Sequence, residues 1–425
     1  MIGVVADDTT GANDIGIMFS KSGYKVKVLT FEENMEIVRD ADVVIIDTDS
    51  RLDSPNTAYD KVFKATKILQ KADCTMFYNK TCSVFRGNIG VEFDAMLDEL
   101  NEDFAIISLS FPQNGRTTTN GIHKVNGKRL EDSEFFHDPV HPMIESNLES
   151  ILKKQTRRNV TSIYLETVRK GPEELKKAIE KAKNDYQYVI IDGQTQEDLT
   201  IIAQAAAGFR VLAGSSALGE ELPKVLPKSA FPNLASTVSI KDSNGVLIIS
   251  GSLTPQTKEQ TKELIESGVF SIVVDSRKIL DSNYQEELDK VYNEAKLRLR
   301  DGQDVLIMAE NNPIIVKETK EIGKLKGFSE LIISKKISGF LAAVSKRLTD
   351  SLDLKRIVAA GGDTSGTVCR HLEIKGNYIV KEIDTGVPSG LVIDKEMLIV
   401  LKSGSFGKKD FLVKAVSHLK ELTTS

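Results

Sequence analysis

The chain has 425 residues, of which 40% are hydrophobic and 28% charged, with a formal net charge of −5. This composition predicts a folded globular protein, and the length predicts two domains. The negative charge argues against a nucleic-acid-binding surface, and no apolar stretch is long enough to span a membrane. Three cysteines without CxxC spacing predict neither disulfides nor a zinc ribbon. Because no signal peptide precedes the first strand, we expect a cytoplasmic protein without nucleic-acid or membrane partners.

Short apolar runs alternate with helical patterns in the first half of the chain. Apolar residues from Ala58 to Ala72 recur at steps of four and three, which is the spacing of one helix face. Alternating strands and helices predict parallel βαβ units. The predicted strands are IGVVA (2–6), KVKVLTF (25–31), DVVIID (42–47), TMFY (75–78), FAIISL (104–109), TSIYLE (161–166), YVIIDG (188–193) and FRVLAG (209–214).

A polar, proline-containing stretch then interrupts the pattern. We predict a linker at 229–243, between an N-terminal domain of 1–228 and a C-terminal domain of 244–425, with a hinge for domain closure at 226–244. The fold class is therefore α/β, with two α/β domains that contain largely parallel sheets. The predicted strands of the second domain are GVLIIS (245–250), SIVVD (271–275), DVLIM (304–308), ELIIS (330–334) and KRIVAAGG (355–362).

The end of the chain differs from the rest. The strands YIVKEI (378–383), LVI (391–393) and LIVLKSG (398–404) follow one another through turns, and a helix over 409–422 closes the chain. The C-terminal domain is therefore expected to end in a β-rich segment.

Charged residues stand at the ends of the first-half strands, where ligands bind in open α/β sheets. Asp7 and Asp8 follow the first strand, and Arg51, Lys80 and Arg86 follow later ones. Arginine binds a carboxylate with two parallel hydrogen bonds and aspartate accepts from hydroxyls, so this set suits a small polyhydroxy acid. Ordinary surface ion pairs and helix caps are the alternative interpretation.

Glycines and hydroxyls follow the second-half strands instead. GGDTSG (361–366) joins a strand to a predicted helix, Ser252 and Thr254 precede another helix, and KSGSFG (402–407) follows a third strand. Glycine permits close backbone approach, and free N–H groups at a helix start favour phosphate, so three such loops favour a nucleotide. The alternative is that they are N-caps and tight turns.

Several familiar motifs are absent. The chain has no G-x-x-x-x-G-K-[ST] loop, no GxGxxG after the first strand and no protein-kinase motifs. Pro139 and Pro142 prevent a helix that would direct His137 and His141 to one metal ion, so these histidines are expected in a loop. Cys82 has no histidine close in sequence, which disfavours a nucleophile.

Six motifs in order resemble the four-carbon acid sugar kinase family: ADDTTGAND, KTCSVFRGNIGVEFDAML, FPQNGRTTTNGIHKVNG, GGDTSG, DTGVPSG and LKSGSFG. The resemblance implies a sugar-acid-binding N-terminal domain, a nucleotide-binding C-terminal domain and ATP-dependent phosphorylation of the terminal hydroxyl of threonate, erythronate or an oxo-tetronate. It also implies two sets of binding residues. The first set faces the acid and consists of Asp8, Arg51, Lys80, Ser83 and Arg86; the second holds ATP and consists of Ser252, Gly361, Gly362, Asp363, Thr364 and Gly404.

One departure from the family pattern concerns the acid. Many members have aspartate where this chain has Cys82, and Val84 and Phe85 also differ. Since this loop is expected to shape the acid pocket, another small hydroxy acid stays open as the substrate.

Phosphoryl transfer needs a positioned hydroxyl and, as a rule, Mg²⁺ on the phosphates. We expect Asp8, with Asp7 as second choice, to orient and deprotonate the hydroxyl, and Asp363 to be a ligand of Mg²⁺ or ribose. The sequence does not identify the metal ligands otherwise. A non-catalytic sensor of sugar acid and nucleotide and an ATP-dependent ligase are the alternative functions. Self-association into a homo-oligomer also stays open.

Overall fold

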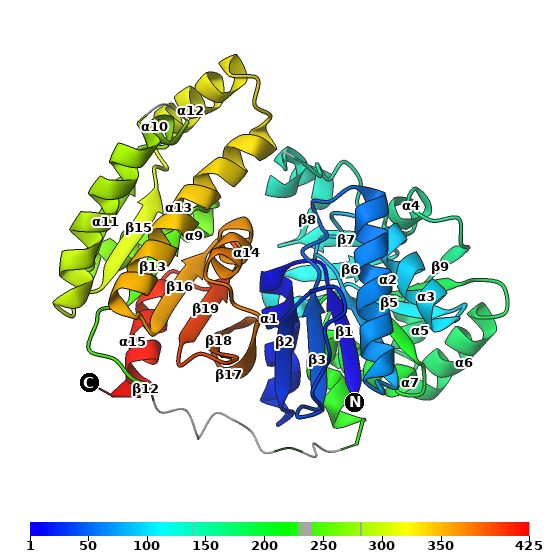
Figure 1. Cartoon of the computed structure of the whole chain (residues 1–425). Coiled ribbons are helices and arrows are strands. Elements are labelled where there is room, and N and C mark those ends of the chain that lie inside the picture. The colour runs from blue at the N-terminus through cyan, green and yellow to red at the C-terminus, as the bar shows by residue number, and fades with distance from the viewer. Residues whose placement is uncertain (139, 228–230, 232–239, 281–282, 425) are drawn as a thin grey trace. The chain divides into compact units, whose positions relative to one another are not determined.

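The computed structural model describes the chain except residues 139, 228–230, 232–239, 281–282 and 425. It divides into two compact units, Met1–Asn233 and Leu234–Ser425 (Figure 1). Most of the predicted 229–243 linker, and with it the predicted hinge, lies outside the described residues. The described end of this stretch forms a short strand, β12 (Ile240–Lys241), which pairs with β20 (Thr423–Thr424).

The first unit is built on a parallel sheet with the strand order β2-β3-β1-β4-β11-β5-β10-β9. Strands β1, β3 and β4 are buried along their whole length, as their apolar sequences require when both faces of a sheet are covered. The strands are β1 (Ile2–Ala6), β2 (Val26–Thr30), β3 (Val43–Asp47), β4 (Met76–Lys80), β5 (Ala105–Ser108), β9 (Val160–Ile163), β10 (Tyr188–Ile191) and β11 (Val211–Gly214).

Helices cover both faces of this sheet. The chain leaves β1 toward β2 and leaves β3 toward β4, which are opposite directions, so right-handed crossovers place α1 and α2 on opposite faces. Helix α1 packs against α8, and α2 packs against α3. The helices are α1 (Thr9–Lys21), α2 (Pro55–Lys71), α3 (Ile89–Leu100), α4 (Leu148–Lys153), α5 (Leu165–Val168), α6 (Pro172–Ala182), α7 (Gln196–Ala206) and α8 (Leu218–Glu221), with short 3₁₀ turns at Pro112–Asn114, Leu130–Asp132, Glu134–His137 and Leu222–Lys224.

A small antiparallel sheet of the first unit was not predicted. It consists of β6 (Arg116–Thr119), β7 (Ile122–Val125) and β8 (Lys128–Arg129). Its two turns use residues with positive φ, Asn120 (52°) and Asn126 (50°), each followed by a glycine. Asn-Gly is the dipeptide that a tight hairpin turn prefers, and this signal in NGIHKVNG was available from the sequence.

The second unit contains a mainly parallel sheet with the order β14-β15-β13-β16-β19-β18-β17. Strands β17, β18 and β19 form consecutive antiparallel pairs, which confirms the β-rich end of this domain. The strands are β13 (Leu247–Ser250), β14 (Phe270–Val274), β15 (Val305–Ala309), β16 (Arg356–Ala360), β17 (Gly376–Asp384), β18 (Val387–Val392) and β19 (Leu398–Lys402); the helices are α9 (Pro255–Glu266), α10 (Ser276–Ile279), α11 (Tyr284–Arg300), α12 (Pro313–Leu325), α13 (Glu330–Leu352), α14 (Gly362–His371) and α15 (Phe411–Glu421).

The predicted strand at 330–334 is wrong, because these residues begin the long helix α13. The Ser329 side chain caps the helix by accepting from the Ile332 amide. Ile333 and then Phe340, Val344 and Leu348 are buried at helical spacing, so a short apolar run was mistaken for a strand. The prediction of an α/β fold with largely parallel sheets is otherwise confirmed.

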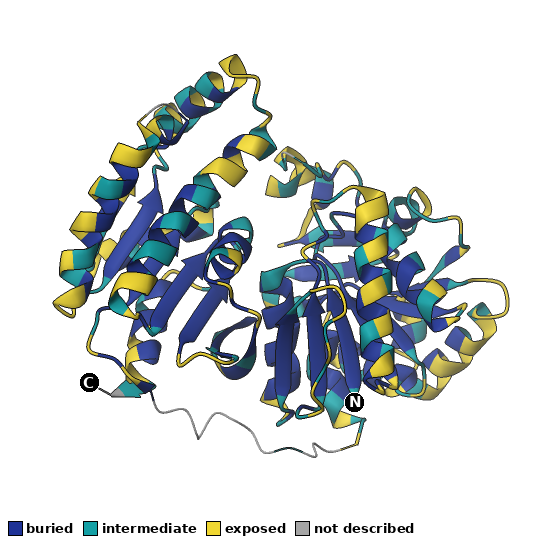
Figure 2. Ribbon diagram, in the orientation of Figure 1, coloured by how far each residue is buried: buried dark blue, intermediate teal, exposed yellow. Residues whose placement is uncertain are grey.

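Burial follows this arrangement. In Figure 2 most strands of both sheets are dark blue, while helices such as α2 and α11 are yellow along one side only. In the second unit the apolar faces of α11, α13 and α14 join β13, β15 and β16 in one core cluster. None of the described helices is long and apolar enough to cross a membrane.

Candidate active site

The first-unit residues that the sequence singled out lie at one edge of the sheet. The last residues of four neighbouring strands are aligned, since Ala6 pairs with both Asp47 and Lys80, and Gly214 pairs with Lys80. The residues that follow these strands are therefore brought close together. Backbone bonds join the loops, since the amides of Ser50 and Arg51 both donate to the Asp7 carbonyl. This is the carboxyl edge, at the point where the chain turns in opposite directions from β1 and β3.

Arg51 binds both carboxylates that follow β1. Its Nε and Nη2 donate to the two oxygens of Asp7, at 2.8 and 2.7 Å, and its Nη1 donates to Asp8 at 2.6 Å. Asp7 is 2% exposed, so the two-pronged ion pair is what makes its burial tolerable. Arg51, Asp7 and Asp8, which the sequence left open as a surface ion pair, therefore form a connected group in which Asp7 is buried and the other two are half-buried.

Asp8 also begins helix α1. Its side chain accepts from the Gly11 amide at 2.8 Å and from the Thr10 hydroxyl at 3.0 Å, which is the geometry of an N-cap. Burial acts to raise the pKa of Asp8, but Arg51 and Lys80 outweigh it and hold the pKa below its ordinary value. Asp8 is consequently an ionised hydrogen-bond acceptor at neutral pH.

Lys80 is buried between Asp8 and a second acid, Asp14. Its Nζ lies 3.8 Å from Asp14 Oδ2 and donates to the Thr81 carbonyl at 3.0 Å. A Cβ on Gly11 would lie 2.9 Å from this Nζ and 2.5 Å from Asp8 Oδ1. Gly11 is therefore the residue that lets the ammonium approach the start of α1.

Asp14 was not singled out by the sequence. Ser216 donates to its Oδ2 at 2.6 Å, while its Oδ1 is buried with no hydrogen-bond partner in the described part of the chain. Burial raises the pKa of Asp14 to about 6, against the opposing effects of Lys80 and Ser216. This carboxyl group can take up or release a proton near neutral pH.

The loop that carries Arg51 is held from the start of α3. Asn88 Nδ2 donates to the carbonyls of Ser50 and Asp53, at 3.1 and 3.0 Å. Gly87 has a φ of 99°, and a Cβ there would lie 2.9 Å from Arg51 Cγ, so only glycine fits beside this side chain. Arg51 is thus fixed by packing as well as by charge.

Arg86 lies in the loop between β4 and α3, and its partners differ from those of Arg51. Its Nη1 donates to Asp138 and its Nε donates to Cys82 Sγ at 3.4 Å. Burial acts to raise the pKa of the Cys82 thiol, but the charges of Arg86 and Arg51 hold it below its ordinary value. Cys82 is therefore the group on which both Arg86 and Arg51 act, whereas the carboxylate partner of Arg86, Asp138, is separate from those of Arg51.

The Ser83 backbone is joined to the hairpin β6–β7 by a chain of two hydrogen bonds. Its carbonyl accepts from His123 Nε2 at 3.0 Å, and His123 Nδ1 accepts from the Thr118 hydroxyl at 2.9 Å. His123 is fully buried, which lowers its pKa to about 3, so the ring is neutral. The same loop holds Phe85 at a φ of 64°, a strained conformation for a bulky residue.

In the second unit three loops converge at the carboxyl edge. Ser250, Ala360 and Lys402 are level in the register of β13, β16 and β19. A Cβ on Gly404 would lie 2.6 Å from Ser252 Oγ, and one on Gly361 would lie 3.3 Å from Ser252 Cβ. The glycines thus allow the loops after these three strands to touch.

The loop after β16 leads directly into α14. Gly361 has a φ of 120° and Gly362 is the first residue of the helix. Thr364 is buried, and Asp363 accepts from the hydroxyls of Ser338 and Ser334, the latter at 3.4 Å. Backbone amides at a helix start beside glycines are suited to phosphate oxygens.

Among the described residues, no group of three or more His, Cys, Asp or Glu side chains is placed to hold a metal ion. His137 lies in a 3₁₀ turn, and His141 lies in the loop that follows, where its Nε2 donates to the Arg51 carbonyl at 3.0 Å.

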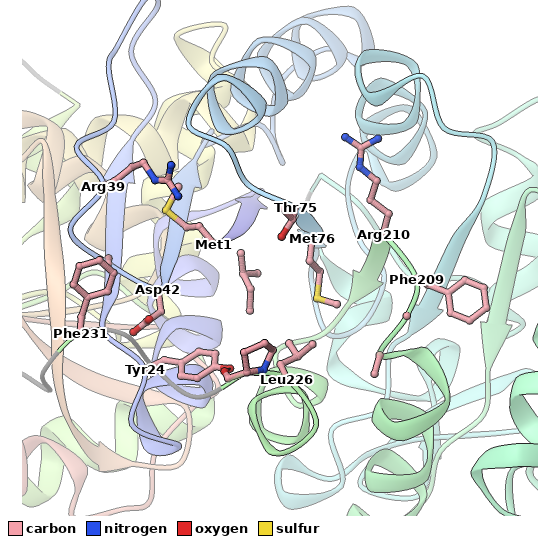
Figure 3. A pocket seen from close by; sticks show the side chains of 15 residues that line it. Met1, Tyr24, Arg39, Asp42, Thr75, Met76, Phe209, Arg210, Leu226 and Phe231 are labelled. Atoms are coloured by element: carbon pink, nitrogen blue, oxygen red, sulfur yellow. The ribbon is translucent and has the colours of Figure 1, made fainter.

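A cavity of about 680 Å³ lies at the opposite, amino edge of the first sheet (Figure 3). It opens beside the start of β1 and β4, and its lining is mostly apolar. Its arginines have partners outside it, Arg39 with Asp73 and Arg210 with Glu102. The lining residues are Met1, Ile2, Tyr24, Arg39, Ala41, Asp42, Thr75, Met76, Ala207, Gly208, Phe209, Arg210, Leu226, Pro227 and Phe231.

Both units match known families. Residues 2–222 match the family model described as a sugar-binding N-terminal domain, and residues 247–412 match the one described as a nucleotide-binding C-terminal domain. A 3-oxo-tetronate kinase of Burkholderia multivorans is 31% identical, over 99% of this chain and 97% of the relative. This chain belongs to the four-carbon acid sugar kinase family.

Other relatives in the family carry two different substrate names. A 3-oxo-tetronate kinase of Haemophilus influenzae is 29% identical, over 97% of this chain and 98% of the relative. A D-threonate kinase of Salmonella typhimurium is 26% identical, over 99% and 98%. A solved Haemophilus influenzae protein is 28% identical with a TM-score of 0.74, covering 98% of this chain and 99% of its own.

Proposed function

We propose that this protein transfers the γ-phosphoryl group of ATP to the terminal hydroxyl of a four-carbon sugar acid. The observation that carries the proposal is the charged cluster at the carboxyl edge of the sugar-binding unit, in which Arg51 binds Asp7 and Asp8 and the buried Lys80 lies between Asp8 and Asp14. Carboxylates suit the hydroxyls of such a substrate and cations suit its carboxylate. Two names among the relatives, 3-oxo-tetronate kinase and D-threonate kinase, agree with this class of substrate.

Asp8 has the role of orienting the acceptor hydroxyl. Because its pKa is held below the ordinary value, it acts as an ionised acceptor that takes the proton as charge develops on the hydroxyl. Both oxygens of Asp7 accept from Arg51, so the role of Asp7 is to position that guanidinium. Lys80, together with Arg51 and with Arg86 and Ser83 of the 80–88 loop, binds the acid.

The nucleotide belongs to the carboxyl edge of the second unit. Ser252, Gly361, Gly362, Thr364 and Gly404 come from three touching loops, whose glycines leave room for phosphate oxygens. Mg²⁺ would arrive on the phosphates, since it is usually bound by one or two carboxylates plus substrate oxygens. Asp363 is the carboxylate of this edge that we assign to Mg²⁺ or the ribose. The ion would neutralise charge on the phosphates.

In this proposal the domain of residues 1–228 binds the acid, and the domain of residues 244–425 binds the nucleotide. We place the protein in the cytoplasm, with the sugar acid and ATP as its partners. Cys74, Cys82 and Cys369 are buried thiols that form no disulfide, which agrees with a reducing compartment.

The test is a substrate screen. Threonates, erythronates and their oxo forms are added with ATP and Mg²⁺, ADP release is measured, and phosphorus NMR of the product distinguishes a phosphate ester from an acyl phosphate. A phosphate ester from one of these acids supports the proposal. Release of an acyl phosphate would indicate a ligase, and nucleotide binding without turnover on any acid would indicate a sensor.

The particular acid depends on the loop that contains Cys82. A neutral or partly ionised thiol beside Arg86 and Arg51 leaves more positive charge there than a fixed carboxylate would. We therefore include hydroxy acids with a second anionic group in the screen.

A further inference from the structure

A lysine is completely buried at the candidate nucleotide site. Lys402 is the last residue of β19 and is 0% exposed. Its Nζ donates to Thr257 Oγ1 at 2.6 Å and to the Gly404 carbonyl at 3.0 Å. Both partners are uncharged, so among the described residues this amino group has hydrogen bonds in the protein interior but no counter-ion.

Buried lysines are normally paired with a carboxylate, because an isolated charge is costly to desolvate. Within the described residues, Lys402 has no ion pair. Titratable side chains on the neighbouring elements have partners of their own: Asp363 of α14 with Ser338, Lys258 of α9 with the Asn311 carbonyl, Glu263 of α9 with Lys409, Asp410 with Lys414, and His418 of α15 with Ser389. The anion that would balance Lys402 is therefore not supplied by these groups.

The bonds of Lys402 set the direction of the following loop. The Gly404 carbonyl accepts from Lys402 and from the hydroxyls of Thr254 and Thr257, at 3.0, 2.6 and 2.8 Å. In a trans peptide the carbonyl and the next N–H point in opposite directions. With the carbonyl directed inward, the Ser405 N–H is directed away from Lys402, where an anion can accept from it.

We propose that Lys402 is a positioning residue of the nucleotide site, whose buried ammonium fixes the 403–407 loop and supplies the positive charge beneath the bound phosphates. A consequence is that the protein takes up a proton when an anionic nucleotide binds. This inference rests on the proposed nucleotide-binding role of the second unit.

The proton uptake follows from burial. Desolvation lowers the pKa of Lys402 to about 7, so above neutral pH most ligand-free molecules hold a neutral amine. A phosphate anion nearby favours the ammonium form and raises this pKa. The proton moves from water or buffer to Nζ, and no other bond forms or breaks.

The first measurement uses the full-length wild type and needs no variant. ADP with Mg²⁺ is titrated calorimetrically from pH 7.5 to 9, above the titration of the nucleotide's terminal phosphate, in buffers with different enthalpies of ionisation. We expect uptake of a fraction of a proton that approaches one, and a Kd that rises by up to about tenfold per pH unit. Tight binding with a constant Kd and no proton uptake would overturn the inference while leaving the proposed function intact.

Two variants complete the test. Lys402→Met keeps the volume and removes the amine; we expect ADP affinity at pH 7 to fall about 10- to 100-fold and the pH dependence above 7.5 to vanish. Lys346→Met removes one positive charge from the surface helix α13 and should bind ADP as the wild type does. A Lys402→Met protein that binds ADP with wild-type affinity and pH dependence would refute the role of Lys402. A folded wild type that binds no ADP at any pH would instead refute the nucleotide site itself.

Discussion

Replacing Asp8 by asparagine separates its structural role from its chemical one. The asparagine oxygen can still accept from the Gly11 amide, and asparagine is as good an N-cap as aspartate, so helix α1 keeps its start. The variant loses one charge opposite Arg51 Nη1, a charge-assisted bond of 2.6 Å. We expect a stability loss of about 1–2 kcal/mol from that bond, and about 1 kcal/mol more in Asp8→Ala, which also loses the cap.

The effect on turnover should be larger than the effect on stability. A positioned general base accelerates a reaction by about 10²–10⁴-fold, which is about 3–5 kcal/mol of barrier. Asp8→Asn is therefore expected to lower kcat for ADP release by at least 10²-fold while leaving the Kd for ADP unchanged. Asp49→Asn, which removes an exposed carboxylate after β3, is the matched control and should keep wild-type turnover. An Asp8→Asn enzyme within about threefold of wild-type kcat would refute the role of Asp8.

The pH profile of the wild type identifies the proton acceptor independently. The pKa of Asp8 lies below its ordinary value, so Asp8 gives no loss of activity between pH 5 and 8. Burial raises the pKa of Asp14 to about 6. An acidic limb centred near pH 6 that disappears in Asp14→Asn would assign the proton transfer to Asp14 instead of Asp8.

Three further outcomes follow from the same contacts. Because the folded-state pKa of Asp14 is raised, the folded protein binds more protons than the unfolded chain between pH 3.8 and about 6, and the stability that this group contributes is lost as pH rises. The stability of Asp14→Asn relative to wild type should therefore increase by about 2 kcal/mol between pH 4 and 7 in unfolding experiments. Gly11→Ala places a Cβ 2.5 Å from Asp8 Oδ1 and 2.9 Å from Lys80 Nζ, so kcat/KM for the acid should fall by about tenfold or more at unchanged ADP affinity. Gly361→Ala must hold a φ of 120°, which costs about 1–2 kcal/mol, and calorimetry should show weaker ADP binding and unchanged acid binding.

The sequence identified the edges of the sheets where charged and glycine-rich residues collect. The hydrophobic pattern shows where each strand ends, and the carboxyl ends of parallel strands lie on one side of a sheet. Asp7, Asp8, Arg51 and Lys80 were found in this way, and the structure brings them together at one edge, where Arg51 binds both aspartates and the charge of Lys80 helps to lower the pKa of Asp8. Motif order was also sufficient for the family. The strand predicted at 330–334 failed because a three-residue apolar run fits a strand and a buried helix equally well.

Only the tertiary structure distinguished exposed charges from buried ones. Asp14 and Lys402 look unremarkable in the chain, yet burial moves the pKa of one up to about 6 and of the other down to about 7. His123 supports the Ser83 carbonyl from 40 residues away, through a hairpin that periodicity did not predict. Local patterns encode which side chains stand at a strand end, whereas desolvation and partners depend on contacts between segments distant in sequence, and these decide the protonation states on which the chemistry depends.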